Sequence, residues 1–475
     1  METRGDAVRA PAYRDRLSTG IVHFGPGAFH RAHQADFVDR LLHADPRWGI
    51  AAVSLRSPGT VRALEGQGGL YTLAILDAEP SFRTIGAHNA FFGPGDGEKV
   101  RRALGDPAIR LVSSTVTEKG YCLAQDGSLD FGHPDIVHDL ARPDAPLSLV
   151  GWLALGLRDR REAGAAPFTS LCCDNMAGNG RKLAAAVQAY AQRLDTELAR
   201  WIAGEARFPD SMVDAITPAT TQALRARVLE ETGDEDAVPV SREAYAAWIV
   251  EDVLPADGPD LAGAGAVLTA DVAAWERAKL RLLNGAHSSL AFLGLLSGHE
   301  TVAGAMGDPD LSGFIERLMI EDIAPTLEPS PLDLRAYVGE LLARFRNPSI
   351  NHLLSQIAWD SSQKLPYRLL DTIAEARAAD RRLDRLALAG AGWMLFVRRQ
   401  ARAGAPIVDP LAPLLEGAGR AQDVAERLLG LRQIFPASLA DDAVVRKALL
   451  EAAADLHARG VRACLSHSKE EPSFA

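Results

Sequence analysis

A lysine, an asparagine and a histidine occur close together in residues 275–290, WERAKLRLLNGAHSSL. On a helix of about 100° per residue, Lys279 and His287 fall in one sector, and Asn284 lies beside His287. Glu276 precedes Lys279 by about one turn. Because leucines of the same segment project into this sector, the spacing predicts a largely buried face, on which polar groups need partners or a chemical role.

These residue types are suited to moving a proton while a hydride is transferred. Burial would lower the pKa of Lys279 toward the working pH and let it act as a general acid/base on a hydroxyl or carbonyl. Asn284 and His287 could donate hydrogen bonds to the alkoxide-like oxygen that develops, and Glu276 could relay the proton to water. By spacing alone, a structural helix with a solvated lysine, a capped asparagine and a core histidine is the simpler interpretation.

A second candidate site is the turn Gly25-Pro26-Gly27-Ala28-Phe29-His30-Arg31, which follows a short apolar run. In a dinucleotide-binding turn, the first glycine permits a tight bend and the second lets backbone N–H groups approach a pyrophosphate. His30 stands where the usual G-x-G-x-x-G pattern has its third glycine. A strand, glycine turn and helix that bind no nucleotide fit this feature equally well.

The end of the next apolar run bears on the choice of dinucleotide. NAD-specific sites usually have an acidic residue there, which bonds the ribose hydroxyls. In this chain the run at 50–55 is followed by Arg56, Ser57 and Pro58. Arg56 could face a 2′-phosphate or lie in solvent, so these residues leave both NAD and NADP open.

The elements around the two candidate sites alternate in the first part of the chain. Apolar runs that predict strands lie at 20–25, 50–55, 70–76, 109–116 and 167–173. Segments with helical spacing lie at 28–43, 97–105 and 146–163. This alternation predicts an α/β fold with a parallel sheet covered on both faces.

Later in the chain the pattern becomes helical. Helices are predicted at 180–194, 195–206 and 242–253, around a stiff loop at 208–221. From Val272 onward almost every segment has helical spacing. The glycine-rich segment 257–271 has the turn residues of a boundary. We therefore predict two domains, 1–270 for dinucleotide binding and 271–475, mostly helical, for substrate binding and catalysis.

Composition excludes some classes of protein. Hydrophobic residues make up 47% and charged residues 24% of the 475, as in folded globular proteins. The net charge of −11 disfavours a nucleic-acid partner. The four cysteines have no C-x-x-C spacing, which predicts reduced thiols. With a charged N-terminus and no long apolar span, the chain is expected in the cytoplasm and not in a membrane.

Seven strings in order along residues 20–465 resemble the mannitol dehydrogenase family of polyol-specific long-chain dehydrogenases. They are IVHFGPGAFHRAHQA, TVTEKGY, CDNMAGNG, MVDAITPATT, WIVEDVLP, KLRLLNGAHSSLAFLG and SSQKLPYRLL. The resemblance implies an N-terminal Rossmann-type domain with insertions and a mostly α-helical C-terminal domain.

The resemblance also implies roles for individual residues. Lys279 would be the general acid/base, Asn284 and His287 would polarise the reacting oxygen, Glu276 would be the proton relay, and no metal would be required. The cofactor side would include Gly25, Gly27, Phe29, His30 and Arg31, with Thr117 and Glu118 near the nicotinamide. The substrate side would include Asn175, Asp214 and Lys364. Capping by Asn175 and Asp214, a solvated Lys364 and a structural Glu118 are the alternatives.

The strings GPGAFHRAHQA and QKLPYR are more similar to the branch that interconverts fructuronate and mannonate than to the mannitol branch. This favours a carboxylated sugar, which would need a cation such as Lys364, Arg368 or His352 in its pocket. The family's usual Asp-Gly-Ser-Gln-Lys string here has Ser361 in place of the glycine. Either the loop accommodates a side chain, or its geometry and substrate preference differ.

The leading hypothesis is an oxidoreductase that interconverts fructuronate and mannonate with NAD(H), with NADP(H) left open. The alternative is a mannitol 2-dehydrogenase or a related arabinitol or sorbitol dehydrogenase. A hypothesis of another class is a catalytically idle nucleotide-binding protein, against which the intact set Lys279, Asn284 and His287 argues. The expected partner is a small sugar, polyol or sugar acid, and no particular oligomeric state is predicted.

Overall fold

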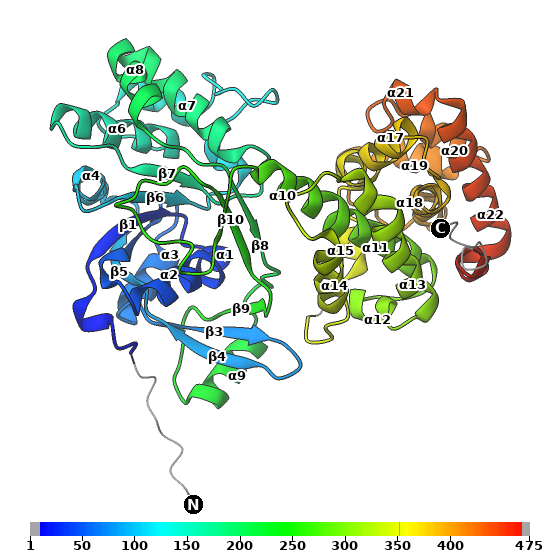
Figure 1. The fold of residues 1–475 in the computed structure, drawn as a ribbon, viewed down its shortest axis with the longest axis horizontal. Coiled ribbons are helices and arrows are strands. Elements are labelled where there is room, and N and C mark those ends of the chain that lie inside the picture. The colour runs from blue at the N-terminus through cyan, green and yellow to red at the C-terminus, as the bar shows by residue number, and fades with distance from the viewer. Residues whose placement is uncertain (1–9, 351, 468–475) are drawn as a thin grey trace, which may run out of the picture. The chain divides into compact units, whose positions relative to one another are not determined.

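The computed structural model describes residues 10–350 and 352–467, and the chain divides into two compact units, Met1–Ala273 and Ala274–Ala475 (Figure 1). The sequence had placed a domain boundary between residues 270 and 271. Part of the charged N-terminal segment, residues 1–9, lies outside the described residues.

The first unit is built on a parallel sheet. Its strands are β1 (Thr19–Phe24), β2 (Gly49–Val53), β5 (His88–Phe92), β6 (Leu111–Ser114) and β7 (Thr169–Cys172), in the order β5-β2-β1-β6-β7. Because β1 is central, the turn at its carboxyl end lies between the ends of β2 and β6. The predicted parallel sheet is confirmed, although the predicted strand at 70–76 lies outside it and β5 was not predicted. The carboxyl edge is where such sheets bind their ligands.

Both faces of the sheet are buried. Val22 and Phe24 of β1 belong to one apolar core with α4, α6, α7 and α8, whereas Ile21 belongs to a second core with α2. Alternate residues of the strand thus serve opposite faces. The helices of this unit are α1 (Ala28–Ala32), α2 (Gln34–Leu42), α3 (Gly59–Gly66), α4 (Gly97–Gly105), α5 (Pro134–Ala141), α6 (Leu149–Glu162), α7 (Asn179–Leu194), α8 (Thr196–Glu205) and α9 (Gln222–Thr232).

Two small sheets are the insertions into this Rossmann-type unit. One has the order β4-β3-β9, with β3 (Tyr71–Leu76), β4 (Ser81–Ile85) and β9 (Val240–Glu243). The other has the order β11-β10-β8, with β8 (Ser211–Asp214), β10 (Ala247–Glu251) and β11 (Val267–Thr269).

Two local predictions fail in these sheets. The predicted helix at 242–253 is instead the end of β9 followed by β10, and the predicted loop at 208–221 contains β8. Trp248, Ile249 and Val250 are all buried. A strand buried on both faces has no alternation that would distinguish it from a helix.

The second unit is mostly helical, as predicted, and has its own apolar core around Trp393. Its α-helices are α10 (Val272–Ala278), which spans the unit boundary, α11 (Ala286–Leu296), α12 (Val302–Met306), α13 (Pro309–Arg317), α14 (Leu334–Phe345), α15 (Leu354–Ile357), α16 (Ser361–Leu365), α17 (Asp371–Ala378), α18 (Asp384–Ala403), α19 (Ala412–Arg420), α20 (Val424–Leu429), α21 (Ala437–Ala440) and α22 (Ala443–His467). Between them lie the π-helices η4 (Lys279–Gly285), η5 (Leu318–Ile323) and η7 (Pro366–Leu370).

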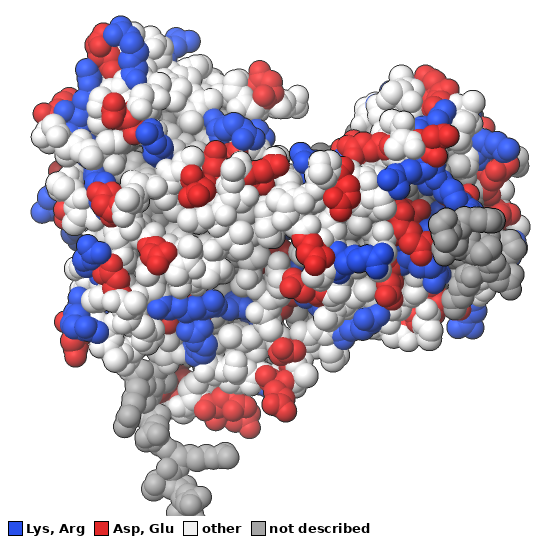
Figure 2. Space-filling model, in the orientation of Figure 1, with Lys and Arg blue, Asp and Glu red and all other residues white. Residues whose placement is uncertain are grey.

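Other expectations concern the surface and the thiols. In the face drawn in Figure 2, basic and acidic side chains are interspersed. All four cysteines are free and buried. Among residues 10–350 and 352–467, no helix has both the length and the apolar character that a membrane crossing requires.

Candidate active site

The glycine turn after β1 has the geometry that its sequence predicts. Gly25 has a φ of 90°, and a Cβ added there would lie 2.2 Å from the Thr115 carbonyl oxygen. A side chain is therefore excluded at this position. Gly27 caps α1, and a Cβ there would have its nearest neighbour at 3.9 Å. The tight bend followed by open space fits the approach of a dinucleotide pyrophosphate.

His30 and Arg31 are buried beside this turn. The His30 ring stacks on His23 with centroids 3.4 Å apart, and its Nε2 lies 3.0 Å from Nε2 of His88. Arg31 donates to the carbonyl oxygens of Pro26, at 3.3 Å, and Val238. These contacts support the turn from within the protein. Phe29 is half-buried.

The three clustered histidines are neutral. Burial lowers the pKa of His23 and His88 to about 3 and holds the pKa of His30 well below its usual value. Nδ1 of His30 and of His88 have no hydrogen-bond partner among the described residues. The sequence analysis selected His30 but missed the cluster, because nothing local relates these three positions.

The loop after β6 is held in an unusual conformation by an aspartate that follows β7. Thr117 has a φ of 65°, which is uncommon for a residue with a side chain. The Asp174 carboxylate accepts the backbone N–H groups of Val116 at 2.9 Å and Thr117 at 3.1 Å, and the Tyr121 hydroxyl at 2.6 Å. Asp174 therefore fixes the loop. Glu118, predicted to lie near the nicotinamide, is exposed.

Asp174 and Asn179 were missed by the sequence analysis, which selected only Asn175 from CDNMAGNG. Burial raises the pKa of the Asp174 carboxyl. Asn179 is fully buried, and its amide donates to the carbonyls of Cys172 at 3.1 Å and Ser211 at 2.9 Å, so it joins β7 to β8. An acidic residue directly after a predicted strand was the sequence signal that could have identified Asp174.

The two predicted substrate residues of this unit differ in exposure. Asn175 is exposed and directly follows Asp174, so it adjoins the loop that carries Thr117. Asp214 is buried at the end of β8, where it is paired with Ala247 of β10. Their roles in substrate binding remain predictions.

The segment with Lys279 is not a plain α-helix. It runs from α10 through the π-helix η4 into α11. The spacing of 100° per residue assumed from the sequence is therefore wrong between Lys279 and Gly285. In a π-helix the hydrogen bonds join residues five apart, so Lys279 and Asn284 lie one π-turn apart on the same side. Both are half-buried, as is Glu276.

His287 lies on the first turn of α11 and is buried. Its ring stacks on Phe345 with centroids 4.1 Å apart and meets the edge of His352 at 5.2 Å. Burial keeps the pKa of His287 well below its usual value, so the ring is neutral. Its Nε2 has no hydrogen-bond partner among the described residues. This nitrogen is thus suited to bond a substrate oxygen.

A second π-helix, η7, packs against η4 and carries Arg368. A Cβ added to Gly285 would lie 2.5 Å from the Arg368 carbonyl oxygen, so only glycine allows this approach. The Arg368 guanidinium donates to Ser288 at 3.1 Å, and its Nε has no partner among the described residues. Burial lowers the pKa of Arg368. In the described parts of the chain, no carboxylate forms an ion pair with Arg368.

Lys364 lies near Arg368, on α16. It is half-buried, and its Nζ donates to the Trp359 carbonyl oxygen at 2.6 Å. Its pKa is lowered by burial first and by the charge of Arg368 second. The charges of Arg344 and Arg368 also lower the pKa of His287, so Arg368 lies near both Lys364 and that ring.

The serine that replaces the family's usual glycine is accommodated. The left-handed residue of this string is Asp360, with a φ of 51°, and Ser361 begins α16. The Ser361 hydroxyl donates to the Asp409 carboxylate at 3.2 Å and accepts the Trp393 indole N–H at 2.9 Å. Of the two alternatives left open by the sequence, the structure supports a loop that accepts a side chain.

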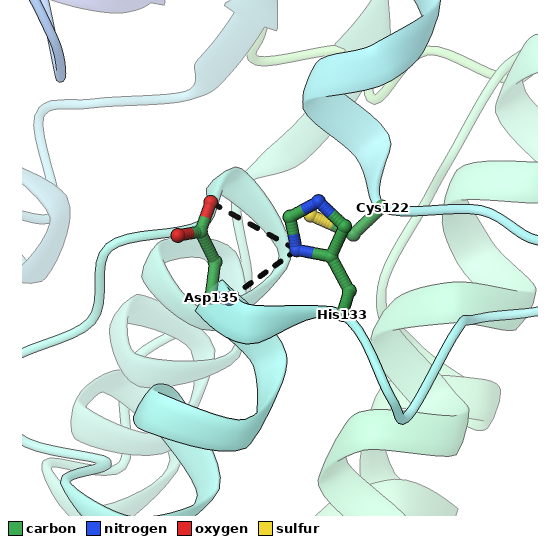
Figure 3. A group of neighbouring side chains, drawn as sticks. All are labelled: Cys122, His133 and Asp135. Atoms are coloured by element: carbon green, nitrogen blue, oxygen red, sulfur yellow. Dashed lines mark hydrogen bonds and ion pairs between the residues drawn. The ribbon is translucent and has the colours of Figure 1, made fainter.

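One cluster in the described residues combines possible metal ligands, Cys122, His133 and Asp135, whose donor atoms lie within 4.8 Å of one another (Figure 3). However, the Asp135 carboxylate is ion-paired with Arg56. Nδ1 of His133 accepts the Asp135 backbone N–H at 3.2 Å. Since two of the three residues are already engaged, we assign the cluster to interactions within the protein.

Comparisons with known proteins identify the family of this chain. The mannitol dehydrogenase Rossmann domain matches residues 19–263, and the mannitol dehydrogenase C-terminal domain matches residues 271–456. D-mannonate oxidoreductase of Escherichia coli K12 is 41% identical over 466 residues, which cover 95% of this chain and 96% of that protein.

Two solved structures share the whole fold. A D-sorbitol dehydrogenase in substrate-free form has a TM-score of 0.90 and 32% identity, covering 97% of this chain and 98% of its own. Mannitol 2-dehydrogenase of Pseudomonas fluorescens, in a ternary complex with NAD and D-mannitol, has a TM-score of 0.79 and 34% identity over 96% of each chain. The chain therefore belongs to the mannitol dehydrogenase family of oxidoreductases.

Proposed function

We propose that the protein interconverts fructuronate and mannonate with NAD(H). The observation that carries the choice of a sugar acid is Arg368, a half-buried guanidinium near His287 with no carboxylate partner in the described residues. A substrate carboxylate would supply that partner through charge-assisted hydrogen bonds. The 41% identity to D-mannonate oxidoreductase supports the same choice.

The chain's residues have distinct tasks in this proposal. Lys279 takes the proton from the substrate hydroxyl during oxidation and returns it during reduction. Asn284 and the neutral His287 donate hydrogen bonds to the oxygen as its charge develops. Glu276, about one turn before Lys279, relays the proton to water. Lys364 contributes a second positive charge to the substrate side, and Asn175 and Asp214 bond the sugar hydroxyls.

The first unit supplies the cofactor site. Gly25 gives the bend, Gly27 leaves room for the pyrophosphate, and the Thr117 loop lies at the neighbouring strand end. The bound dinucleotide would supply or accept the hydride. The ternary complex of the Pseudomonas fluorescens relative contains NAD, which supports NAD(H) as the cofactor.

Steady-state rates test the proposal. Fructuronate and fructose would be reduced, and mannonate, mannitol, arabinitol and sorbitol oxidised, each with both nicotinamide cofactors, while the nicotinamide absorbance is followed. We expect the highest kcat/KM with fructuronate and NADH. A higher kcat/KM with fructose would instead assign a polyol 2-dehydrogenase.

The variant Lys279→Ala separates an enzyme from an idle nucleotide-binding protein. We expect kcat to fall by about 10²–10⁴-fold, the usual contribution of general acid/base catalysis, with NADH affinity retained. Lys447→Ala, which removes an exposed lysine of α22 paired with Glu451, is the matched control and should keep full activity. Unchanged turnover in Lys279→Ala would refute the proposed role.

A further inference from the structure

An ion pair connects two segments that flank the glycine turn. Arg56 follows β2, and Asp135 lies in the first turn of α5, on the connection that follows β6. The two side chains form a salt bridge. Since β2 and β6 are the neighbours of β1, this salt bridge lies on the elements that border a dinucleotide's adenosine half in such sheets.

Asp135 is held more firmly than its partner. Its side chain is 13% exposed, against 69% for Arg56. The ring nitrogen of His133 caps α5 by accepting the Asp135 backbone N–H (Figure 3). A carboxylate in the first turn of a helix is also stabilised by the helix dipole. Arg56 is therefore the more exposed member, and its pairing with Asp135 determines where the Arg56 charge lies.

The segment after β2 has no acid of its own. Residues 54–57 are Ser, Leu, Arg and Ser, and the Ser54 hydroxyl donates to the Ser57 carbonyl oxygen at 2.6 Å. An acid at this strand end usually bonds the ribose 2′-hydroxyl, whereas an arginine there accommodates a 2′-phosphate. In this chain the strand end carries Arg56, and the acid that pairs with it, Asp135, belongs to α5.

We propose that Asp135 selects NAD(H) against NADP(H) by restraining Arg56 and by opposing a 2′-phosphate. A phosphate at the 2′ position would have to displace the carboxylate from Arg56 and lie beside that carboxylate, with like charges in contact. A 2′-hydroxyl meets no such repulsion and can donate a hydrogen bond to the carboxylate. The inference rests on the proposed nucleotide site but not on the identity of the sugar substrate.

Equilibrium binding of NADH and NADPH to the full-length protein, measured by calorimetry without substrate, tests the inference. In the wild type, NADH should bind more tightly. Asp135→Asn should tighten NADPH binding at least tenfold relative to NADH binding. Asp195→Asn makes the same change of net charge at another arginine-paired aspartate near a helix N-terminus, 2.9 Å from Arg161, and should leave the ratio unchanged.

Arg56→Gln provides a second measurement, at a side chain that is 69% exposed. Added to Asp135→Asn, it should abolish the gain in NADPH binding. If the ratio of the two dissociation constants is the same in the wild type and Asp135→Asn, the selectivity role is wrong while the proposed function stands. If the wild type binds neither nucleotide, the proposed function is overturned, and this inference with it.

Discussion

The surroundings of His287 fix its ring so that Nε2 can make one hydrogen bond to a substrate. Its ring is fixed between Phe345 and His352, it is neutral because it is buried, and its Nε2 has no partner among the described residues. An unsatisfied buried nitrogen costs free energy in the folded protein. A substrate oxygen would satisfy it.

Replacing His287 by Asn should lower kcat/KM by about 10²–10³-fold, the usual effect of removing one donor to a developing oxyanion. The shape of the pH profile should not change. Because burial depresses the pKa of His287 well below its usual value, the ring does not titrate near neutral pH. If the pH profile of His287→Asn lacked an inflection that the wild type shows, the expectation that His287 does not titrate would be wrong. His299→Asn, which removes a part-exposed histidine near Asp308, is the control.

Arg368 should determine the preference for a charged substrate. We expect Arg368→Gln to lower kcat/KM for fructuronate by about 10–100-fold, the usual effect of losing a charge-assisted hydrogen bond. The kcat/KM for fructose should change by less than about threefold. Arg377→Gln, which removes an arginine paired with Asp442 at 3.2 Å, is the matched control. Equal losses with both substrates would indicate a structural role only.

At the scale of elements, π-helices and strand ends bring the polar groups into position. The π-turn of η4 aligns Lys279 with Asn284, which an α-helix would separate in angle. In the first unit, Asp174 at the end of β7 holds the loop that leaves β6. Each site thus depends on a departure from regular geometry that neighbouring elements stabilise.

Asp174→Asn should loosen the loop that leaves β6. An amide can accept one of the two backbone N–H groups but turns its own N–H toward the other, so we expect KM for NADH to rise about 10–100-fold, with the far-UV circular dichroism unchanged. Asp130→Asn, on the connection to α5, is the control because that carboxylate accepts the nearby Gly132 N–H at 2.8 Å. An unchanged KM in Asp174→Asn would remove this positioning role.

At the scale of the molecule, each unit has its own apolar core, and the first contains the neutral histidine cluster of His23, His30 and His88. The folded state keeps these rings neutral down to about pH 3 for His23 and His88, whereas unfolded histidines titrate near 6.5. Between these values the unfolded chain binds more protons, so the free energy of unfolding falls as the pH falls.

Acidification should therefore destabilise the protein. From pH 7 to pH 5 the protonation of His23 and that of His88 in the unfolded chain each lower the free energy of unfolding by about 2 kcal/mol. In urea unfolding at both pH values, the free energy of unfolding should fall less between pH 7 and pH 5 in His88→Gln than in the wild type. Asp322, whose pKa burial raises to about 6, and Asp174, whose pKa burial also raises, act in the opposite direction, but they do so equally in the wild type and the variant. Equal losses in both proteins would refute the role of the cluster.

The parallel sheet, the helical second half and the glycine bend could be predicted from the sequence, and the roles of Lys279, Asn284 and His287 stay predictions. These features follow from local periodicity, from the conformations that glycine allows and from strings that identify the family. The sequence analysis missed β8 and β10, because their pairing is non-local and both faces of β10 are buried.

The contacts between polar groups became known from the fold and not from the sequence. Packing brings together residues that the sequence does not relate. Examples are the π-turn at Lys279, the hydrogen bonds of Asp174 to the Thr117 loop, the approach of Arg368 to Gly285 and the salt bridge of Arg56 with Asp135. A sequence pattern reports which residue types are available. Their partners depend on contacts between distant segments, and these contacts determine charge, burial and hydrogen bonding.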